Sequence, residues 1–328
     1  MYGRDELAHA VTFEKEHVRL GFSPRQNVAV LSYLEARCKH TDTLGQKGRH
    51  RVVEYSLQVC FSNSANATMP YMMDHDDFGD RLYWDKVTPE NIQELRERLL
   101  QWPERHELCY PDELQRVMED DDYCRNIVCQ MRLNMPSAHK FVAEMLTWRR
   151  AMGLKELREE HLPKAVLERC IVYPYGKDKS GCQVLVLRNK NYSKGLADPD
   201  SVKRVFLYFI EKLFNERKVP KITLLMDCTD TGVSNIDIDL LQFVVDVFIS
   251  KYPIALGNAL IYNMPWLLNA LLKMIKGWLP FGVERLKTVN KKDIQQYIDA
   301  KYLPVRMGGV DTYEYTYTPG SPLGDGIH

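Results

Sequence analysis

Three short apolar runs in the second half of the chain alternate with helical stretches, and this alternation limits the possible folds more than any other feature. The runs are Cys182–Leu187, Lys221–Asp227 and Ala259–Tyr262. A strand that is apolar on both sides must be covered on both sides, as in parallel and mixed sheets. Residues 160–318 are therefore predicted to form an α/β domain with a parallel or mixed sheet flanked by helices.

The segments around these runs supply the rest of the predicted domain. Apolar residues recur at helical spacing in Val202–Phe214 and Ile238–Tyr252, which we expect to be helices. A fourth strand is predicted at Leu286–Val289, and a helix capped by Asn290 is predicted over Asn290–Lys301.

Residues 87–159 predict a small all-helical module before this domain. Thr88 precedes a proline, and Asn91 follows three residues later, which is typical of a helix start. Further helices are expected at Pro111–Met118 and Asp121–Met131, and a longer one is expected between a Ser137 cap and Gly153. Residues 1–86 form an extension of unknown structure, and residues 319–328 form a C-terminal tail.

Composition narrows the class of protein. Lysine plus arginine and aspartate plus glutamate both number 44, so no overall field favours nucleic acid. The N-terminus lacks the apolar core of a signal peptide, and the eight cysteines form no CxxC pair. We therefore expect a reduced, cytoplasmic protein that does not bind nucleic acid.

The segment Trp266–Lys276 is unusually apolar for a helix of a globular domain. Its polar residues Asn269, Lys273 and Lys276 fall on one narrow stripe, and the rest of its circumference is apolar. One interpretation is a buried core helix. The other is a helix with a bound lipid-like ligand on its inner side and a membrane on its outer side. The pattern alone leaves both open.

Motifs for catalysis are missing from the sequence. It contains neither G-x-x-x-x-G-K nor G-x-G-x-x-G, so it has no phosphate-binding loop of these kinds. The stretch Gly232–Ile236 lacks the second glycine of a nucleophile elbow, and Asp74–Asp77 reads as a solvated acidic loop. We therefore expect a protein that is not an enzyme and that needs no cofactor or metal.

Five short motifs follow one another in residues 172–318. They are Gly176-Lys177-Asp178-Lys179-Ser180-Gly181, Met226-Asp227 followed by Gly232 and Ser234, Lys251-Tyr252-Pro253, Tyr262-Asn263-Met264-Pro265-Trp266, and Leu303-Pro304-Val305-Arg306-Met307-Gly308-Gly309. In this order and spacing they resemble the CRAL-TRIO lipid-binding domain, the fold of phosphatidylinositol-, retinal- and tocopherol-binding proteins. Within the family, Met264-Pro265-Trp266-Leu267 and Tyr302-Leu303-Pro304 resemble the members that also carry a motile-sperm domain and a membrane anchor. Neither follows before His328, so tethering by such an anchor is not inferred.

The resemblance implies a mixed, mainly parallel sheet flanked by helices, and a cavity for one hydrophobic ligand between this sheet and an apolar gate helix. Candidates for its floor are Leu185, Leu187, Leu224, Met226, Leu260 and Tyr262. Candidates for the gate are Trp266, Leu267, Ala270, Leu271, Met274 and Ile275. Candidates for membrane or headgroup contact are Lys273, Lys276, Trp278 and Arg285. Burying an acyl chain gains about 0.8 kcal/mol per methylene, so a long tail can be held without polar chemistry.

One departure from the family pattern concerns the ligand. Members that bind phosphatidylinositol usually carry glutamate after the Tyr-Pro turn, where this chain has Ile254, and Arg285 replaces a lysine. The ligand can therefore be a phospholipid or an isoprenoid- or sterol-like molecule. We expect a lipid-transfer or lipid-presenting protein that is cytoplasmic and peripheral on membranes, with a transient membrane partner. The alternative is a protein-interaction or adaptor module at membrane contact sites without a bound lipid.

Overall fold

The computed structural model describes residues 83–195, 198–217, 219–280 and 282–323. The predicted acidic loop Asp74–Asp77 and most of the predicted extension lie outside these residues. The described chain divides into two units, and the segment Leu267–Lys273 falls in the smaller one. The helical module, the sheet and the cavity belong to the larger unit. Among the described residues, no helix is long and apolar enough to cross a membrane.

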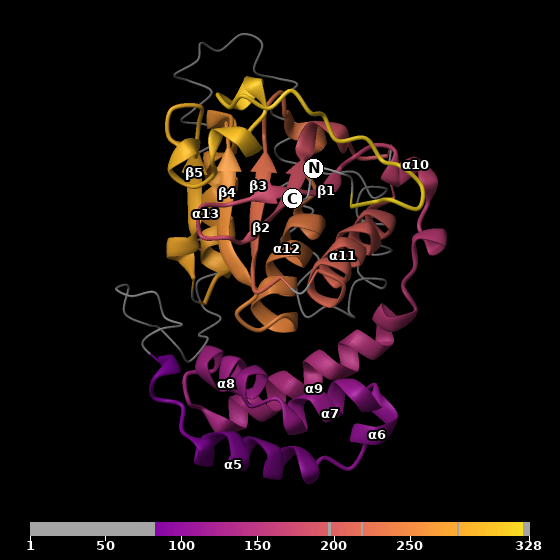
Figure 1. Ribbon diagram of the computed structural model, residues 1–328, viewed down its shortest axis with the longest axis vertical. Coiled ribbons are helices and arrows are strands. Elements are labelled where there is room, and N and C mark those ends of the chain that lie inside the picture. Colours follow the sequence, from indigo (N-terminus) through magenta and orange to yellow (C-terminus); the bar gives the residue numbers. More distant parts are fainter. Residues whose placement is uncertain (1–82, 196–197, 218, 281, 324–328) are drawn as a thin grey trace, which may run out of the picture. The chain divides into compact units, whose positions relative to one another are not determined.

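The helical module consists of short helices around its own apolar core (Figure 1). The helices are α5 (Pro89–Leu100), α6 (Arg105–Leu108), α7 (Pro111–Glu119), α8 (Asp121–Gln130) and α9 (Met135–Ala151). The predicted start at Thr88 is confirmed, because Thr88 and Asn91 exchange side-chain and backbone hydrogen bonds in a capping box. The predicted Ser137 cap is wrong: α9 begins two residues earlier, and the Asn134 side chain accepts from the Ser137 amide at 2.9 Å.

The sheet has five strands in the order β1-β2-β3-β4-β5. The strands are β1 (Val172–Lys177), β2 (Gln183–Arg188), β3 (Ile222–Asp227), β4 (Leu256–Tyr262) and β5 (Leu286–Val289). Strand β1 pairs with β2 in antiparallel fashion, and the other neighbours are parallel. The prediction of a mixed, mainly parallel sheet flanked by helices is confirmed.

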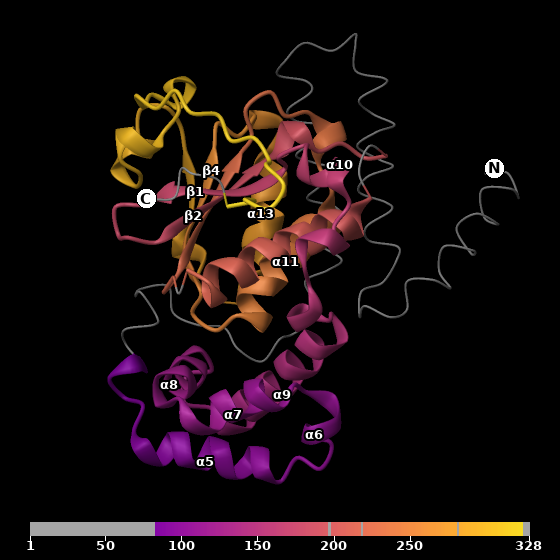
Figure 2. The same cartoon turned by 45° about the vertical axis from the view of Figure 1, so that its right-hand side comes forward.

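The helices between the strands follow the βαβ pattern of parallel pairing. They are α11 (Pro199–Asn215), α12 (Ile238–Asp246) and α13 (Asn269–Trp278), while the short helix α10 (Lys164–Leu167) precedes β1. Helices α11 and α12 lie side by side against the sheet (Figures 1 and 2), and the Phe206 and Phe243 rings meet between them at 6.3 Å. After α12 the chain widens into one π-helical turn, Val247–Lys251, where the sequence predicted a continuous helix.

The other face of the sheet is covered by the C-terminal segment. Leu225, Leu260 and Tyr262 form a buried cluster there with Leu303 and Met307. The predicted helix over Asn290–Lys301 is wrong, because this stretch forms two separate 3-10 turns, Ile294–Gln296 and Ala300–Tyr302. The backbone of this stretch pairs with the loop after β1 instead. The Tyr297 carbonyl accepts from the Lys179 amide at 2.8 Å, and Ile298 forms a β-bridge with Asp178.

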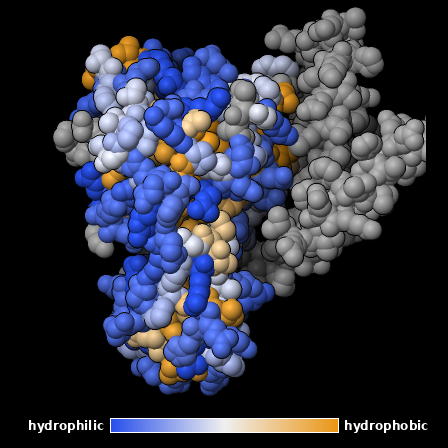
Figure 3. Space-filling model, turned by 90° about the vertical axis from the view of Figure 1, so that its right-hand side faces the viewer, coloured by the Kyte–Doolittle hydropathy of each residue, from blue (hydrophilic) through white to orange (hydrophobic). Residues whose placement is uncertain are grey.

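The face of the molecule in Figure 3 is mainly hydrophilic, with smaller hydrophobic areas between the polar side chains. Scattered apolar side chains of this kind are normal on protein surfaces and need no partner. The scattered apolar side chains on this face therefore do not indicate a binding site.

Candidate lipid-binding cavity

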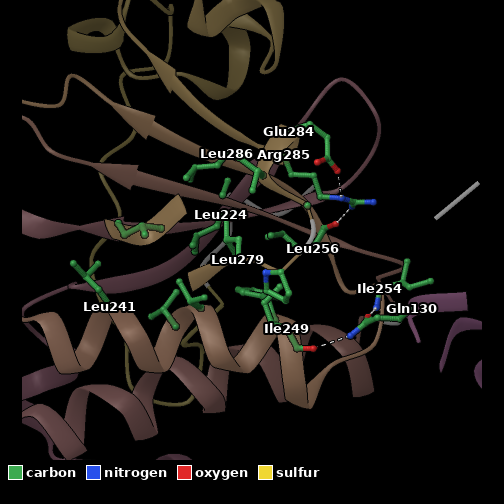
Figure 4. Close-up of a pocket in the computed structure, with 18 of the residues that line it drawn as sticks. Gln130, Leu224, Leu241, Ile249, Ile254, Leu256, Leu279, Glu284, Arg285 and Leu286 are labelled. Carbon is green, nitrogen blue, oxygen red and sulfur yellow. Dashed lines mark hydrogen bonds and ion pairs between the residues drawn. The ribbon is translucent and has the colours of Figure 1, made fainter. Parts of the chain in front are cut away.

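A cavity of about 360 Å³ lies between one face of the sheet and the helices that cover it. Figure 4 shows its apolar side chains pointing inward from the strands and from the helix below them. The wall opposite the sheet comes from α12 and the π-helical turn, including Leu241, Val244, Phe248 and Ile249, and the end of α13 adds Ile275 and Leu279. The space is lined mostly by apolar groups, as in pockets that bind one small hydrophobic ligand.

The floor of the cavity is built by Leu224 and Met226 of β3 together with Ala259 and Ile261 of β4. The first two are among the predicted floor residues. The structure places the predicted Leu260 and Tyr262 on the opposite face, in the cluster with Leu303. Side chains of a strand alternate between faces, so only one of the two sets in β4 can face the cavity.

Two further predicted floor residues are on the correct face but do not line the cavity. Leu185 pairs with Leu224 and Leu187 pairs with Met226 in the parallel register, so each pair shares a face. Both leucines of β2 are buried, at 0% and 5% exposure, and neither lines the cavity. They belong to the packed core of the sheet, beside the open space.

The predicted gate segment is helical, as expected, and Ile275 near its end lines the cavity. It begins with a 3-10 turn, Trp266–Leu268, and continues as α13. Ile275 lines the cavity; Met274 and Trp278 are half-buried, Lys276 is exposed, and Trp266 is 44% exposed. The predicted gate and membrane residues Leu267, Ala270, Leu271 and Lys273 fall in the smaller unit, so their relation to the cavity remains a prediction.

Polar side chains gather at the end of the cavity where β4 and β5 begin. They are Gln130, Arg132, Glu284 and Arg285. The Arg285 guanidinium donates to the carbonyls of Leu256 and Gly257, and its Nε lies 4.0 Å from Glu284 Oε1 (Figure 4). With only 12% of its side chain exposed, Arg285 is a fixed, mostly buried cation at one end of an apolar space.

Gln130 joins the helical module to the cavity wall, a role that the sequence analysis missed. Its Nε2 donates to the Ile249 carbonyl at 2.7 Å, and its Oε1 accepts from the Ile254 amide at 2.7 Å (Figure 4). The side chain thus bridges the π-helical turn and the segment that follows it. A signal was present: Gln130 is the one polar residue in the apolar run Ile127–Met131.

Ile254 lies where the helical module, the turn and the cavity meet. It lines the cavity and packs against the apolar core of the helical module. Its φ is +52°, which is a strained backbone conformation for a β-branched residue. The hydrogen bond from its amide to Gln130 helps to hold this conformation.

A buried ion network holds the preceding residues of the same turn. Arg149 of α9 lies 2.8 Å from Glu113 of α7 and 3.0 Å from Glu211 of α11, and the Tyr252 hydroxyl donates to Glu211. Burial raises the pKa of Glu113 and the pKa of Tyr252. One arginine therefore serves two carboxylates, and the network fixes the position of the chain two residues before Ile254.

Comparison with known proteins identifies the domain that holds this cavity. Residues 167–309 match the profile of the CRAL/TRIO domain family. A CRAL-TRIO domain-containing protein of Schizosaccharomyces pombe is 27% identical over 252 residues, which are 72% of this chain and 56% of the relative. The phosphatidylinositol transfer protein CSR1 of Eremothecium gossypii is 27% identical over 144 residues, which are 43% of this chain and 33% of the relative.

These matches cover 56% and 33% of the lengths of the two curated relatives, less than two thirds in each case. Among solved structures, the crystal structure of Sfh5 superimposes with a TM-score of 0.51 over 76% of this chain and 95% of that chain, at 15% identity. At this identity the likeness concerns the fold alone. The family profile and the curated relatives together show a CRAL-TRIO domain at residues 167–309 of this chain.

Proposed function

We propose that this chain binds one hydrophobic, lipid-like ligand in the 360 Å³ cavity and transfers it between membranes or presents it there. The observation that carries the proposal is the lining: an apolar floor and wall with a small polar group, Gln130, Arg132, Glu284 and Arg285, at one end. This arrangement suits an amphiphile, whose tail gains free energy by leaving water and whose polar end needs hydrogen bonds. One relative is named a phosphatidylinositol transfer protein, which supports lipid binding and transfer as the class of activity.

The ligand is proposed to be a phospholipid or an isoprenoid- or sterol-like molecule. Ile254 faces the cavity where inositol-binding members of the family carry a carboxylate, so this wall offers an inositol ring no acceptor from that side chain. Arg285 already donates to the carbonyls of Leu256 and Gly257. Both facts favour a ligand with a smaller or less hydroxylated polar end than inositol.

Access to the cavity is proposed to depend on the segment from Trp266 to Trp278 acting as a gate. Trp266 is 44% exposed and Ile275 is buried against the cavity, so the segment presents apolar groups both outward and inward. Tryptophan is favoured at membrane interfaces, so Trp278 with Lys273 and Lys276 remain the proposed membrane contacts, and Arg285 remains the proposed contact for the headgroup of the bound lipid. In this mode of action the protein associates transiently and peripherally with membranes, and no catalysis is required.

The resemblance of Met264-Pro265-Trp266-Leu267 and Tyr302-Leu303-Pro304 to motile sperm domain-containing protein 2 supports a further proposal. The chain is proposed to be related to the CRAL-TRIO portion of that protein. The support comes from these two segments and from Met307-Gly308-Gly309.

The alternative function is a protein-interaction or adaptor module at membrane contact sites, with no lipid in the cavity. Organic extraction of the purified protein, followed by mass spectrometry, separates the two functions. Lipid at about one molecule per chain, or uptake of labelled lipid from vesicles to that level, supports the first. Protein that carries no lipid and takes up none would leave the adaptor function in its place.

A further inference from the structure

A group of exposed apolar and basic residues surrounds the carboxyl ends of strands β4 and β5. The group, which we name the carboxyl-end surface, consists of Trp266, Val305, Val310, Lys291, Lys292 and Lys301. Val305 and Val310 are 56% and 71% exposed. Of the six large apolar side chains that are exposed among the described residues, three belong to this group.

Backbone contacts bring these segments to one edge of the sheet. The Asn263 amide, three residues before Trp266, donates to the Val289 carbonyl at 2.9 Å, and Lys291 follows two residues after Val289. The Tyr262 hydroxyl lies 3.5 Å from the Arg306 carbonyl. In Figures 1 and 2 the short gold and yellow turns accordingly lie beside the arrowheads of β3 and β4.

The loop that carries the two valines is fixed by its own hydrogen bonds. The Val305 amide donates to the Asp311 carbonyl at 3.2 Å, and the Asp311 amide donates to the Leu303 carbonyl at 3.1 Å. A Cβ at Gly309 would lie 1.8 Å from the Leu303 carbonyl oxygen, so only glycine permits this closure. Val305 and Val310 are therefore held outward by a closed loop, and their exposure does not reflect a loose chain end.

Basic residues flank the valines, and two of the four nearby acids pair with cations. The Lys291 stem packs against Gly308, and Val310 donates its amide to the Ala300 carbonyl next to Lys301. All three lysines of the surface are exposed. Among the neighbouring carboxylates, Asp227 pairs with Arg306 and Asp299 pairs with Lys179. Asp293 and Asp311 accept from the neutral amides of Asn290 and Tyr313 and keep their negative charge, so the three lysines leave a small positive excess on this surface.

We propose that the carboxyl-end surface is a membrane-docking site that shares only Trp266 with the proposed gate segment and lies outside helix α13, and that it selects bilayers with anionic lipids. The valines and Trp266 would enter the interfacial layer, and the lysines would remain among the phosphates, as on interfacial segments of peripheral proteins. The proposal deepens the proposed function. It rests on that function for one point, namely that lipid transfer is the reason for binding to membranes. Docking is a property of this surface whether or not the cavity is filled.

The position of this surface relative to the cavity determines how the cavity would be oriented on a docked bilayer. Strand β4 begins at Leu256, next to Arg285, and ends at Tyr262, next to the Arg306 carbonyl. A bilayer at the carboxyl ends therefore lies at the opposite end of β4 from Arg285. The polar end of the cavity would point away from the docked membrane.

Vesicle flotation of the full chain tests the proposal, with phosphatidylcholine vesicles and with vesicles that also contain phosphatidylserine. The V305S/V310S variant should bind the mixed vesicles about tenfold more weakly, because two valines no longer leave water. Lys291→Gln with Lys292→Gln should weaken binding to the mixed vesicles by about tenfold or more and leave phosphatidylcholine vesicles unaffected. The matched control is L100S/L108S, which removes two exposed leucines from the helical module (54% and 40% exposed).

The experiment distinguishes failure of the docking site from failure of the proposed lipid-binding function. Unchanged binding by V305S/V310S, or an equal loss in L100S/L108S, would overturn the docking site and leave this surface to a protein partner. Lipid content measured on the same samples reports on the cavity alone. If the parent carries and takes up no lipid while V305S/V310S still loses vesicle binding, the proposed function fails and the docking site stands.

Discussion

The amide of Ile254 donates to the side-chain oxygen of Gln130 at 2.7 Å, across 124 residues of sequence. The same amide group of Gln130 donates to Ile249 from its nitrogen, so one side chain closes both ends of the turn that leaves the π-helix. Ile254 in turn has a φ of +52° and faces the cavity. The shape of the cavity wall therefore depends on a residue of the helical module, outside the residues 167–309 that match the family profile.

Replacing Gln130 by leucine should loosen this wall. The change keeps the size of the side chain but leaves the Ile249 carbonyl and the Ile254 amide without their partner, which should cost about 1–3 kcal/mol of unfolding free energy. Ligand should also dissociate faster, because Ile254 is freed from its strained conformation. Urea unfolding and the release of labelled lipid measure the two effects. The control is Gln115→Leu, which removes an exposed bond to Glu119 on α7; an equal result in both variants would contradict this role for Gln130.

The sheet and most of its helices were predictable because buried faces require apolar residues at regular positions along the sequence. A strand covered on both faces is apolar at successive positions, and the runs at Cys182–Leu187, Lys221–Asp227 and Ala259–Tyr262 correspond to β2, β3 and β4. The same feature hides which side chains face the cavity. In a strand with no polar alternation, Leu260 and Ile261 look alike, and only the register fixes their faces.

Other parts of the structure depend on contacts that a local pattern does not contain. Asn290–Lys301 has the capping residue and the apolar spacing of a helix, but its backbone bonds to Lys179 and Asp178 instead. The role of Gln130 depends on a partner more than a hundred residues away. Tertiary hydrogen bonds of this kind override local propensity, and they are where the sequence-based prediction failed.

A charge on the apolar side of the proposed gate should stop lipid exchange. Leu271 lies within α13, and Leu271→Asp adds a carboxylate that would have to leave water when the gate meets a ligand or a bilayer. We expect transfer between vesicles to fall by about tenfold or more, with the far-UV circular dichroism and melting temperature retained. Leu100→Asp, at a position that is 54% exposed on α5, should transfer lipid like the parent. Parent-like transfer by Leu271→Asp would show that this helix is not the gate.

The Glu113–Arg149–Glu211 network should make stability depend on pH. Burial raises the folded-state pKa of Glu113, and the Oε2 atom of Glu113 has no hydrogen-bond partner among the described residues. A raised folded pKa means that the protonated form is favoured in the folded protein. The resulting stabilisation is present below the unfolded pKa and is lost as pH rises through the folded one.

Glu113→Gln should therefore flatten the decline in urea midpoint that begins as the pH rises above the usual range of a glutamate pKa. Arg149 keeps Glu211 as a partner at 3.0 Å in this variant, so the network is not emptied of charge. Glu94→Gln changes an exposed glutamate that pairs with Arg98 on α5 and serves as the control. A parent-like slope in Glu113→Gln would mean that another group causes the decline.

Two adjacent residues of β4 give the sharpest test of the cavity, because their side chains point to opposite faces of the sheet. Ala259 lines the cavity, so Ala259→Phe should place a ring in the space that the ligand needs. Lipid content should drop, while the unfolding free energy should change by less than about 1 kcal/mol, because the ring enters open space and displaces no packed neighbour. Leu260 is fully buried in the cluster on the other face, so Leu260→Ala should cost about 2–5 kcal/mol and leave lipid content per folded chain unchanged. Mass spectrometry and urea unfolding on both variants separate the two effects. If Leu260→Ala lost the lipid and Ala259→Phe kept it, the ligand would lie on the opposite face from this cavity.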